Sequence, residues 1–334
     1  VVTNPIDLEM ILKTCLPKDD LHRFMQKVIG NGGIFAPVPI WRRRRQILIP
    51  AFSTKVTNQY TDIFCNNGEK LVKKLAKVDG KGKFSIWPYL SAYTLDSVLD
   101  LQEYQRKSFL DLLISLSGGG RGYTNIELRE EILTLTIAAT DTSAIVTGYT
   151  LKLLAKYPKI QEKVYEELYE IFGNSNRSIT KDDLLQMKYL KRVIKESLRL
   201  FPPAPFIIRK VETDVRLPSG RVLPAGSGVV VSIWGCHRDP KYWGADAEHF
   251  DPDRFLPERF DLKHRSSFLP FSSGPRNCVG YQYAFMSIKT SLAMILRYYK
   301  VVGEPEKGPI PHIRVKLNIM MKDVDGYQVA LERR

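Results

Sequence analysis

The chain has 334 residues, of which 44% are hydrophobic and 26% are charged, and its formal net charge at pH 7 is +14. This composition excludes a disordered or low-complexity chain and is sufficient for a large buried core. The four cysteines form no Cys-x-x-Cys pair, which argues against a disulfide scaffold or a zinc module and favours a reducing compartment. No stretch of eighteen consecutive apolar residues occurs, so the sequence predicts no membrane-spanning helix.

The high positive charge raises the question of nucleic-acid binding. Acidic residues are interspersed with the basic ones, however, and the densest basic run, Arg42 to Arg45, directly follows Trp41. A plain solvated surface is the default explanation. The functional alternative is a docking face for an acidic partner or a membrane surface, near Arg42–Arg44 and Lys289. We expect no nucleic-acid partner.

The first third of the chain is predicted to be helical. Apolar residues at helical spacing indicate helices over residues 5–13, 19–29, 41–50, 53–79 and 87–99. The glycine-rich stretch 118–122 lacks the Gly-Lys-Ser/Thr ending of a phosphate-binding loop, and no strand precedes it. We therefore interpret this stretch as a flexible connection to the next helix.

A long central helix is predicted to begin at Thr124, because Thr124 and Glu127 have the spacing of a capping box. Pro158 ends it near Tyr157, and a helix of that length extends about 50 Å at 1.5 Å per residue. Inside it, Ala138–Ser143 places an aspartate and threonines among apolar residues. Such polar side chains are costly to bury unless they are hydrogen-bonded, and the ordinary solution is a bond to the preceding helical turn.

The second half of the chain mixes helices with short strands. Helices are expected over residues 158–172, 189–200 and 284–297, and strands within 206–233, 313–321 and 328–331. The predicted fold class is therefore mainly α with small antiparallel β sheets. Glu196 and Arg199 are three residues apart and share a helix face, a pattern that is common in surface ion pairs and says little alone.

Residues 271–280 read Phe-Ser-Ser-Gly-Pro-Arg-Asn-Cys-Val-Gly. The Ser-Ser-Gly-Pro portion predicts a loop, so Cys278 is presented at the start of the following helix. A helix N-terminus favours the thiolate and lowers the pKa of a cysteine. Such a cysteine can be a nucleophile, a redox sensor or a metal ligand, whereas a single cysteine without further context is more often a small buried apolar residue.

The spacing Phe-x-x-Gly-x-Arg-x-Cys-x-Gly resembles the haem-binding loop of the cytochrome P-450 family. The resemblance implies that Cys278 is the axial thiolate ligand of haem iron, which favours O–O cleavage. Gly274 would allow the tight bend and Gly280 the close approach of haem to the helix. Phe271 would shield the sulfur, and Arg276 would contact a haem propionate.

Other segments match further motifs of the same family. Trp41 and Arg45 are similar to its Trp-x-x-x-Arg element, which contacts haem propionates, and Arg209 matches another propionate-binding position. An amphipathic surface helix and an ordinary strand arginine are the structural alternatives. Asp141 and Thr142 match the oxygen-activation signature, in which Thr142 would hydrogen-bond dioxygen and Asp141 would relay protons. Ala139 replaces the glycine that is usual in that signature.

The resemblance also implies a buried triad of Glu196, Arg199 and a second arginine. Two strings compete for the second arginine: Phe-Asp-Pro-Asp-Arg-Phe around Arg254, and Pro-Glu-Arg-Phe around Arg259. The first is similar to members of the microsomal family-4 clan, as is Arg-Glu-Glu at 129–131, so we choose Arg254.

Ala138 occupies the position at which many members of that clan carry a glutamate esterified to haem. Alanine cannot form this ester, so the resemblance predicts haem b held without a covalent bond.

The sequence departs from the family near residue 100. Leu99-Asp100 continues directly into Leu101, whereas relatives carry several helices before the segment matching 109–113. The family's N-terminal anchor, first helix and first strands are also missing before Val1. The resemblance therefore predicts an incomplete cytochrome P-450 fold that forms one partial haem-binding domain over residues 1–334.

The activity implied by this resemblance is that of a haem-thiolate monooxygenase. It would insert one atom of O2 into a fatty acid, a lipid signal or a xenobiotic, with electrons from NADPH through a flavoprotein reductase or cytochrome b5. The implied location is the cytosolic face of the endoplasmic reticulum membrane, with peripheral contact. The alternative is a non-catalytic remnant that binds haem weakly or serves only as an interaction module, because lost helices leave costly cavities.

Overall fold

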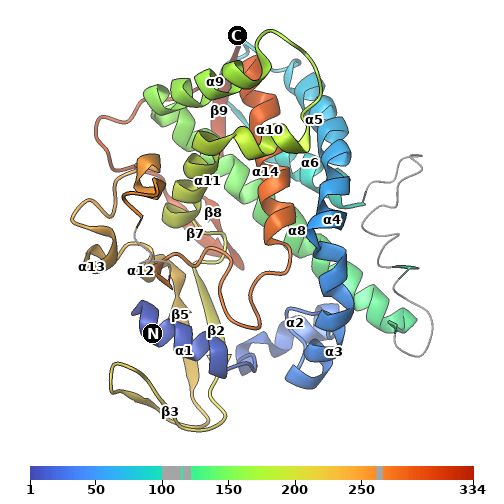
Figure 1. Ribbon diagram of the computed structural model, residues 1–334, viewed down its shortest axis with the longest axis vertical. Helices are drawn as coiled ribbons and strands as arrows, with labels where there is room; N and C mark the ends of the chain where they lie inside the picture. Colours follow the sequence, from blue (N-terminus) through green and yellow to red (C-terminus); the bar gives the residue numbers. More distant parts are fainter. Residues whose placement is uncertain (100–113, 116–121, 261–265) are drawn as a thin grey trace.

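The computed structural model describes residues 1–99, 114–115, 122–260 and 266–334 (Figure 1). Its described part is mainly helical with small antiparallel sheets, as the sequence predicts. The expected junction at Asp100–Leu101, the segment 109–113 and most of the glycine-rich stretch lie outside the described residues. Within them, no helix has both the length and the apolar character needed to cross a membrane.

Helices dominate the first third of the chain. They are α1 (Pro5–Thr14), α2 (Arg23–Ile29), α3 (Val38–Leu48), α4 (Thr54–Thr57), α5 (Thr61–Leu75) and α6 (Trp87–Leu99), with 3-10 turns η1 (Asp20–His22), η2 (Ile49–Phe52) and η3 (Asn58–Tyr60). Helix α3 begins at Val38 rather than at Trp41, because Pro39 in its first turn favours a helix start. Trp41 therefore lies one turn inside the helix.

The long helix α8 (Asn125–Lys156) crosses the molecule, with its N-terminal end projecting beside α3 (Figure 1). The predicted capping box is present, because the Thr124 hydroxyl accepts from the Glu127 N–H and the Glu127 carboxylate accepts from the Thr124 N–H. The C-terminal half of α8 is almost completely buried. Residues 143–155 of α8 thus form the centre of the core.

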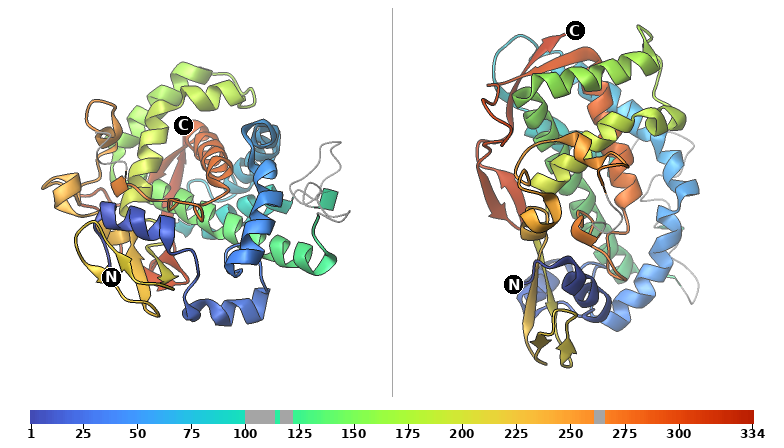
Figure 2. Two further views of the ribbon diagram at one scale, coloured as in Figure 1. Left: turned by 60° about the horizontal axis from the view of Figure 1, so that its bottom comes forward. Right: turned by 60° about the vertical axis from the view of Figure 1, so that its left-hand side comes forward.

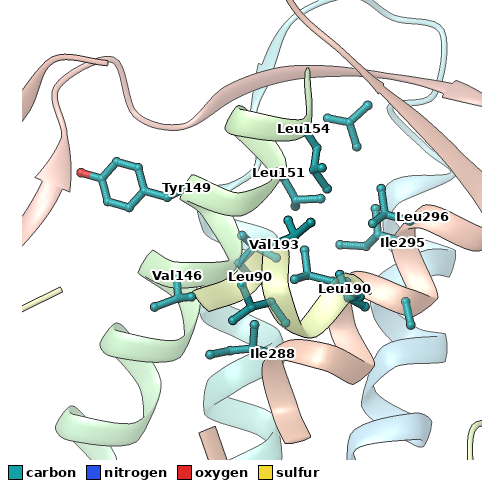
Figure 3. Packing of buried hydrophobic residues seen from close by; sticks show 14 of the residues in the cluster. Leu90, Val146, Tyr149, Leu151, Leu154, Leu190, Val193, Ile288, Ile295 and Leu296 are labelled. Carbon is teal, nitrogen blue, oxygen red and sulfur yellow. The ribbon is translucent and has the colours of Figure 1, made fainter. Parts of the chain in front are cut away.

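Four further helices lie against the buried half of α8 or near it. They are α9 (Pro158–Phe172), α10 (Lys181–Gln186), α11 (Lys188–Leu200) and α14 (Tyr281–Tyr298). Figure 3 shows Val146 and Leu154 of α8 in one buried cluster with Leu90 of α6, Val193 of α11 and Ile288 of α14. Each fully buried aliphatic side chain of this kind contributes about 1.5–3 kcal/mol relative to an exposed one.

Short antiparallel sheets surround the helices. They comprise β1 (Phe84–Ser85), β9 (Gln328–Arg333) and β6 (Tyr299–Val302) in that order, β2 (Phe206–Lys210) with β5 (Gly228–Ser232), β3 (Val215–Arg216) with β4 (Val222–Leu223), and β7 (Val315–Asn318) with β8 (Met320–Asp323). Strands β1 and β6 were not expected from the sequence. Between β5 and α14 the chain forms α12 (Ile233–Cys236), α13 (Pro240–Trp243) and η4 (Pro252–Phe255).

Helix α1 and the β2–β5 ribbon lie together at one end of the molecule, close to the loop that carries Cys278 (Figure 2). Residue Val2 bridges to Val231 of β5, and Lys18 bridges to Arg209 of β2. Both edges of the ribbon are therefore held by the N-terminal segment. This arrangement brings the N-terminal segment together with residues from the second half of the sequence.

Candidate functional site

The loop before α14 has the turn geometry that its sequence predicts. Ser272 and Gly274 have positive φ angles of 60° and 73°, and the Cys278 N–H donates to the Phe271 carbonyl at 2.9 Å. Gly280 is the N-cap of α14, and its N–H is directed at the Cys278 thiol. Cys278 is exposed, whereas the other three cysteines are buried. The fold thus presents one thiol for binding.

The glycines and the phenylalanine of this loop have distinct surroundings. A Cβ on Gly274 would lie 2.4 Å from the Leu12 carbonyl oxygen, so α1 and the positive φ both demand glycine there. A Cβ on Gly280 would meet the Phe52 ring at 3.4 Å, an ordinary contact. The Phe271 ring packs 5.5 Å from the Phe285 ring of α14.

The pKa of the Cys278 thiol is raised, because surrounding protein atoms shield the sulfur from bulk water. The Gly280 N–H and the charge of Arg45 act in the opposite direction but do not prevail. The expectation of a lowered pKa at a helix start is therefore wrong for this protein without a bound metal. A coordinated metal ion would deprotonate the thiol outright.

The guanidinium groups of two arginines lie close to the Trp41 ring. The guanidinium of Arg276 lies 4.5 Å from the centroid of the Trp41 ring, and that of Arg45 lies 5.9 Å from it. Arg276 donates from Nη2 to the Ala36 carbonyl at 2.7 Å, but its buried Nε and Nη1 have no hydrogen-bond partner. Arg45 instead donates to Asn277 in the cysteine loop.

A third arginine, Arg209 on β2, is only 1% exposed, and its Nε and Nη1 also lack a partner. Burial lowers the pKa of Arg209 and of Arg276 to about 10. Lys18 adjoins Arg209, and burial together with the charges of Arg209 and Arg276 lowers its pKa. Sequence reasoning missed Lys18, because its loop carries no motif and its neighbours lie far away in the sequence.

This group of cations needs an anionic partner. Buried charges are ordinarily paired, because an unpaired one is costly, whereas Nε and Nη1 of both Arg209 and Arg276 have no hydrogen-bond partner. Haem carries two propionates and an iron that accepts a thiolate. The residues present, three arginines and a lysine beside an exposed cysteine, therefore fit haem.

The predicted proton-relay residues lie on the half-buried part of α8. Thr142 donates from its hydroxyl to the Ala138 carbonyl at 2.6 Å, which is the local bond expected of a threonine within a helix. Asp141 pairs through Oδ2 with Lys322 Nζ of β8 at 2.9 Å. Ala139 lines a small apolar cavity together with Tyr283 of α14. The cavity thus places α8 opposite the helix that follows Cys278.

The structure brings the expected triad together. Arg199 forms a bidentate pair with Glu196 at 2.7 and 2.8 Å, and both side chains are fully buried. Arg254 lies 3.6 Å from Glu196 and binds Asp246 at 2.9 Å. Arg259 pairs with Asp251 on the surface instead. The geometry therefore favours Arg254 over Arg259 as the third member.

The comparison with protein-family models shows to which family this chain belongs. The model of the family described as Cytochrome P450 matches residues 2–102 and 97–327. The chain belongs to the cytochrome P450 family. Members of this family hold haem through a cysteine thiolate and react with O2, which agrees with the exposed thiol and the unpaired cations.

Relatives of this cytochrome P450 carry family-4 names, as the sequence predicts. The chain is 39% identical to Cytochrome P450 4g15 of Drosophila melanogaster over 70% of its length and 40% of that protein's. It is 37% identical to Cytochrome P450 4X1 of Mus musculus over 76% of its length and 46% of that protein's. It is 27% identical to human Cytochrome P450 4V2 over 99% of its length and 79% of that protein's.

The family match is divided where the sequence predicts missing helices. Its two segments meet at residues 97–102. The alignment with human 4V2 extends over 422 positions, at least 88 more than the 334 residues of this chain. Both observations agree with an internal block that relatives carry and this P450 lacks.

The expected docking face is wrong in two of its residues. Lys289 is buried and donates from Nζ to the Leu184 carbonyl, and burial lowers its pKa to about 8. Arg44 is also buried and pairs with Glu130 of α8 at 2.7 Å. Arg42 and Arg43 remain exposed, and Arg43 pairs with Glu127. Lys289 and Arg44 therefore make contacts inside this P450 and do not form part of an exposed docking face.

Proposed function

We propose that this protein is a haem-thiolate monooxygenase with a non-covalently bound haem b. The observation that carries the proposal is the group of buried, unpaired guanidinium nitrogens of Arg209 and Arg276 beside the exposed thiol of Cys278. In this proposal Cys278 is the iron ligand. Lys18, Arg209 and Arg276 bind the propionates, and Trp41 supports Arg276 through its ring.

The protein's own residues would bind, orient and supply protons. When bound, haem supplies the oxygen activation by which one oxygen atom enters a C–H or C=C bond and the other leaves as water. Asp141 is half exposed, so its carboxylate can take up a proton from solvent. The Thr142 hydroxyl is adjacent in the chain and can pass a proton onward once it leaves the Ala138 carbonyl.

The absorption spectrum of the purified, haem-loaded protein tests this function, after reduction and exposure to carbon monoxide. We expect a strongly red-shifted Soret band that is lost in Cys278→Ala. The control is Cys15→Ala, which removes a buried thiol on the α1 side of the site and should keep the band. Failure to take up haem, or a band that Cys278→Ala leaves unchanged, would contradict the proposal.

The electron donor in this proposal is an NADPH-dependent flavoprotein reductase, with cytochrome b5 as a second donor. Its docking face is restricted to exposed cations such as Arg42, since Arg44 and Lys289 are buried. Electron transfer should then weaken with added salt. The proposed location is the cytosolic face of the endoplasmic reticulum membrane, with a fatty acid, lipid signal or xenobiotic as substrate.

A second candidate is a non-catalytic remnant. It is favoured by three apolar residues on one face of α8, Ile126, Leu133 and Ile137, which are 74%, 40% and 49% exposed. Loss of covering helices would leave such residues without partners. The same spectrum separates the two candidates, because a remnant would take up no haem or would not ligate it through a thiolate.

A further inference from the structure

Helix α8 is joined to the β7–β8 hairpin by two ion pairs of different character. Lys152 of α8 pairs with Asp323 of β8 at 2.7 Å, and both side chains are nearly or fully buried. One strand position away, Lys322 Nζ lies 2.9 Å from Asp141 Oδ2, with side chains 25% and 36% exposed. The first pair fixes the hairpin on the helix. The second reaches solvent and involves the carboxylate to which the proposed function assigns proton transfer.

The Lys322 side chain is held by more than the carboxylate. Its Nζ lies 4.5 Å from the centroid of the Trp87 ring at the start of α6. That ring is stacked on Tyr327 at 5.3 Å, and the Tyr327 N–H donates to Asp323 at 2.7 Å. Lys322 is therefore held by the Trp87 ring as well as by the carboxylate, so it can fix Asp141 better than a lysine with a single surface contact could.

We propose that Lys322 is a positioning residue that holds the Asp141 carboxylate at the solvent-exposed edge of α8 for proton uptake. The proposal rests on the proposed function. In this role the Asp141 carboxylate would take up a proton from solvent and pass it to the Thr142 hydroxyl, which would hand a proton on towards bound haem, and the carboxylate would then be regenerated. The electrons come from NADPH, as in the proposed function.

The hairpin offers a matched control for this proposal. Lys316 of β7 is directly opposite Lys322 in the β-sheet register, is exposed, and has no ion pair with any residue that the structure describes. Lys316→Met and Lys322→Met thus remove the same charge from the same hairpin. Only Lys322→Met removes a contact with Asp141.

The contact itself is tested by thermal unfolding of Lys322→Met, Asp141→Asn and the double variant, with and without haem. If the two residues interact, the effects on the melting temperature are less than additive, whereas those of Lys316→Met and Asp141→Asn add. Additive effects of Lys322→Met and Asp141→Asn would overturn the proposal whether or not the protein is active.

The positioning role is tested by the share of NADPH electrons that are recovered as hydrogen peroxide and by the solvent isotope effect on NADPH consumption. Proton transfer by a positioned group is worth about 10²–10⁴-fold, so we expect Lys322→Met to raise the peroxide share about tenfold. Lys316→Met should leave it unchanged. In the Asp141→Asn background, Lys322→Met should have no further effect.

Two results separate this proposal from the proposed function. An equal rise in peroxide from Lys322→Met in both backgrounds, with normal haem binding, would overturn the positioning role alone. Wild-type protein that takes up no haem would overturn both.

Discussion

Arg45 of α3 donates two hydrogen bonds to Asn277, from Nη1 to its carbonyl at 2.9 Å and from Nη2 to its side-chain Oδ1 at 2.5 Å. Asn277 immediately precedes Cys278, so α3 is attached to the loop that presents the thiol. The sequence resemblance assigns Arg45 to a propionate. The structure adds that Arg45 also fixes the loop, and that its charge favours the thiolate form of Cys278.

We expect Arg45→Ala to weaken haem binding about tenfold or more, because each hydrogen bond from a charged group is worth about 1.5–3 kcal/mol. Arg42→Ala is the control, since Arg42 is exposed on the same helix. Haem transfer to an excess of apomyoglobin measures retention. Equal rates of haem loss from the two variants would show that Arg45 does not hold the loop.

Removing Arg199 should destabilise the fold strongly, because it leaves the fully buried Glu196 without its bidentate partner. The expected loss in the free energy of unfolding is about 3–5 kcal/mol. Arg259→Ala breaks only an exposed pair with Asp251 and should cost under about 1 kcal/mol. Urea unfolding measures both, with Arg199→Lys as a milder variant if Arg199→Ala does not fold. Similar losses in the two alanine variants would contradict a structural role for the triad.

The sequence predicts local features of the fold well. Helix α8 starts at its capping box and ends before Pro158, because both signals act on the backbone within one turn. The bend at Gly274 follows from the glycine in the same way. Cap and turn chemistry depends on neighbours in the chain, and these neighbours are visible in the sequence.

Features that depend on distant residues were missed. Lys18 joins Arg209 only because the N-terminal segment pairs with β2. Lys289 was expected on a docking face, but it is buried and its Nζ donates a hydrogen bond to the Leu184 carbonyl of α10. The raised pKa of Cys278 reflects desolvation of the sulfur by nearby protein atoms, although the residue is exposed, and a helix-start argument does not include that desolvation. Burial is a property of the packed chain, and periodicity alone does not fix it.

Gly274→Ala should be one of the most damaging small substitutions in the site. It combines an unfavourable positive φ with a Cβ placed 2.4 Å from the Leu12 carbonyl oxygen. Gly220→Ala has a similar φ of 86° but open space around its Cβ, so it should lose only about 1–2 kcal/mol from backbone strain. Thermal unfolding should show a clearly larger loss for Gly274→Ala. A loss no greater than that of Gly220→Ala would mean that the α1 contact relaxes freely.

Acid should destabilise the protein through His237, which is fully buried. Burial and the charge of Arg199 lower its pKa to about 3, and its Nε2 accepts the Leu269 N–H at 2.8 Å. The unfolded chain has an ordinary histidine pKa near 6.5, so between about pH 6.5 and 3 it binds a proton that the folded protein does not. Stability is therefore lost as pH falls through this window, by up to about 1.4 kcal/mol per unit.

Unfolding measured from pH 7 to pH 4 tests this with His237→Gln. The variant should have a lower free energy of unfolding than wild type at pH 7, because packing and the Leu269 hydrogen bond are disturbed. This difference between variant and wild type should become smaller as the pH falls. The reason is that the variant has no imidazole at this position for the unfolded chain to protonate. His312→Gln, at an exposed histidine, should keep the wild-type slope. A constant difference in the free energy of unfolding between His237→Gln and wild type across the pH range would assign the acid sensitivity to groups other than His237.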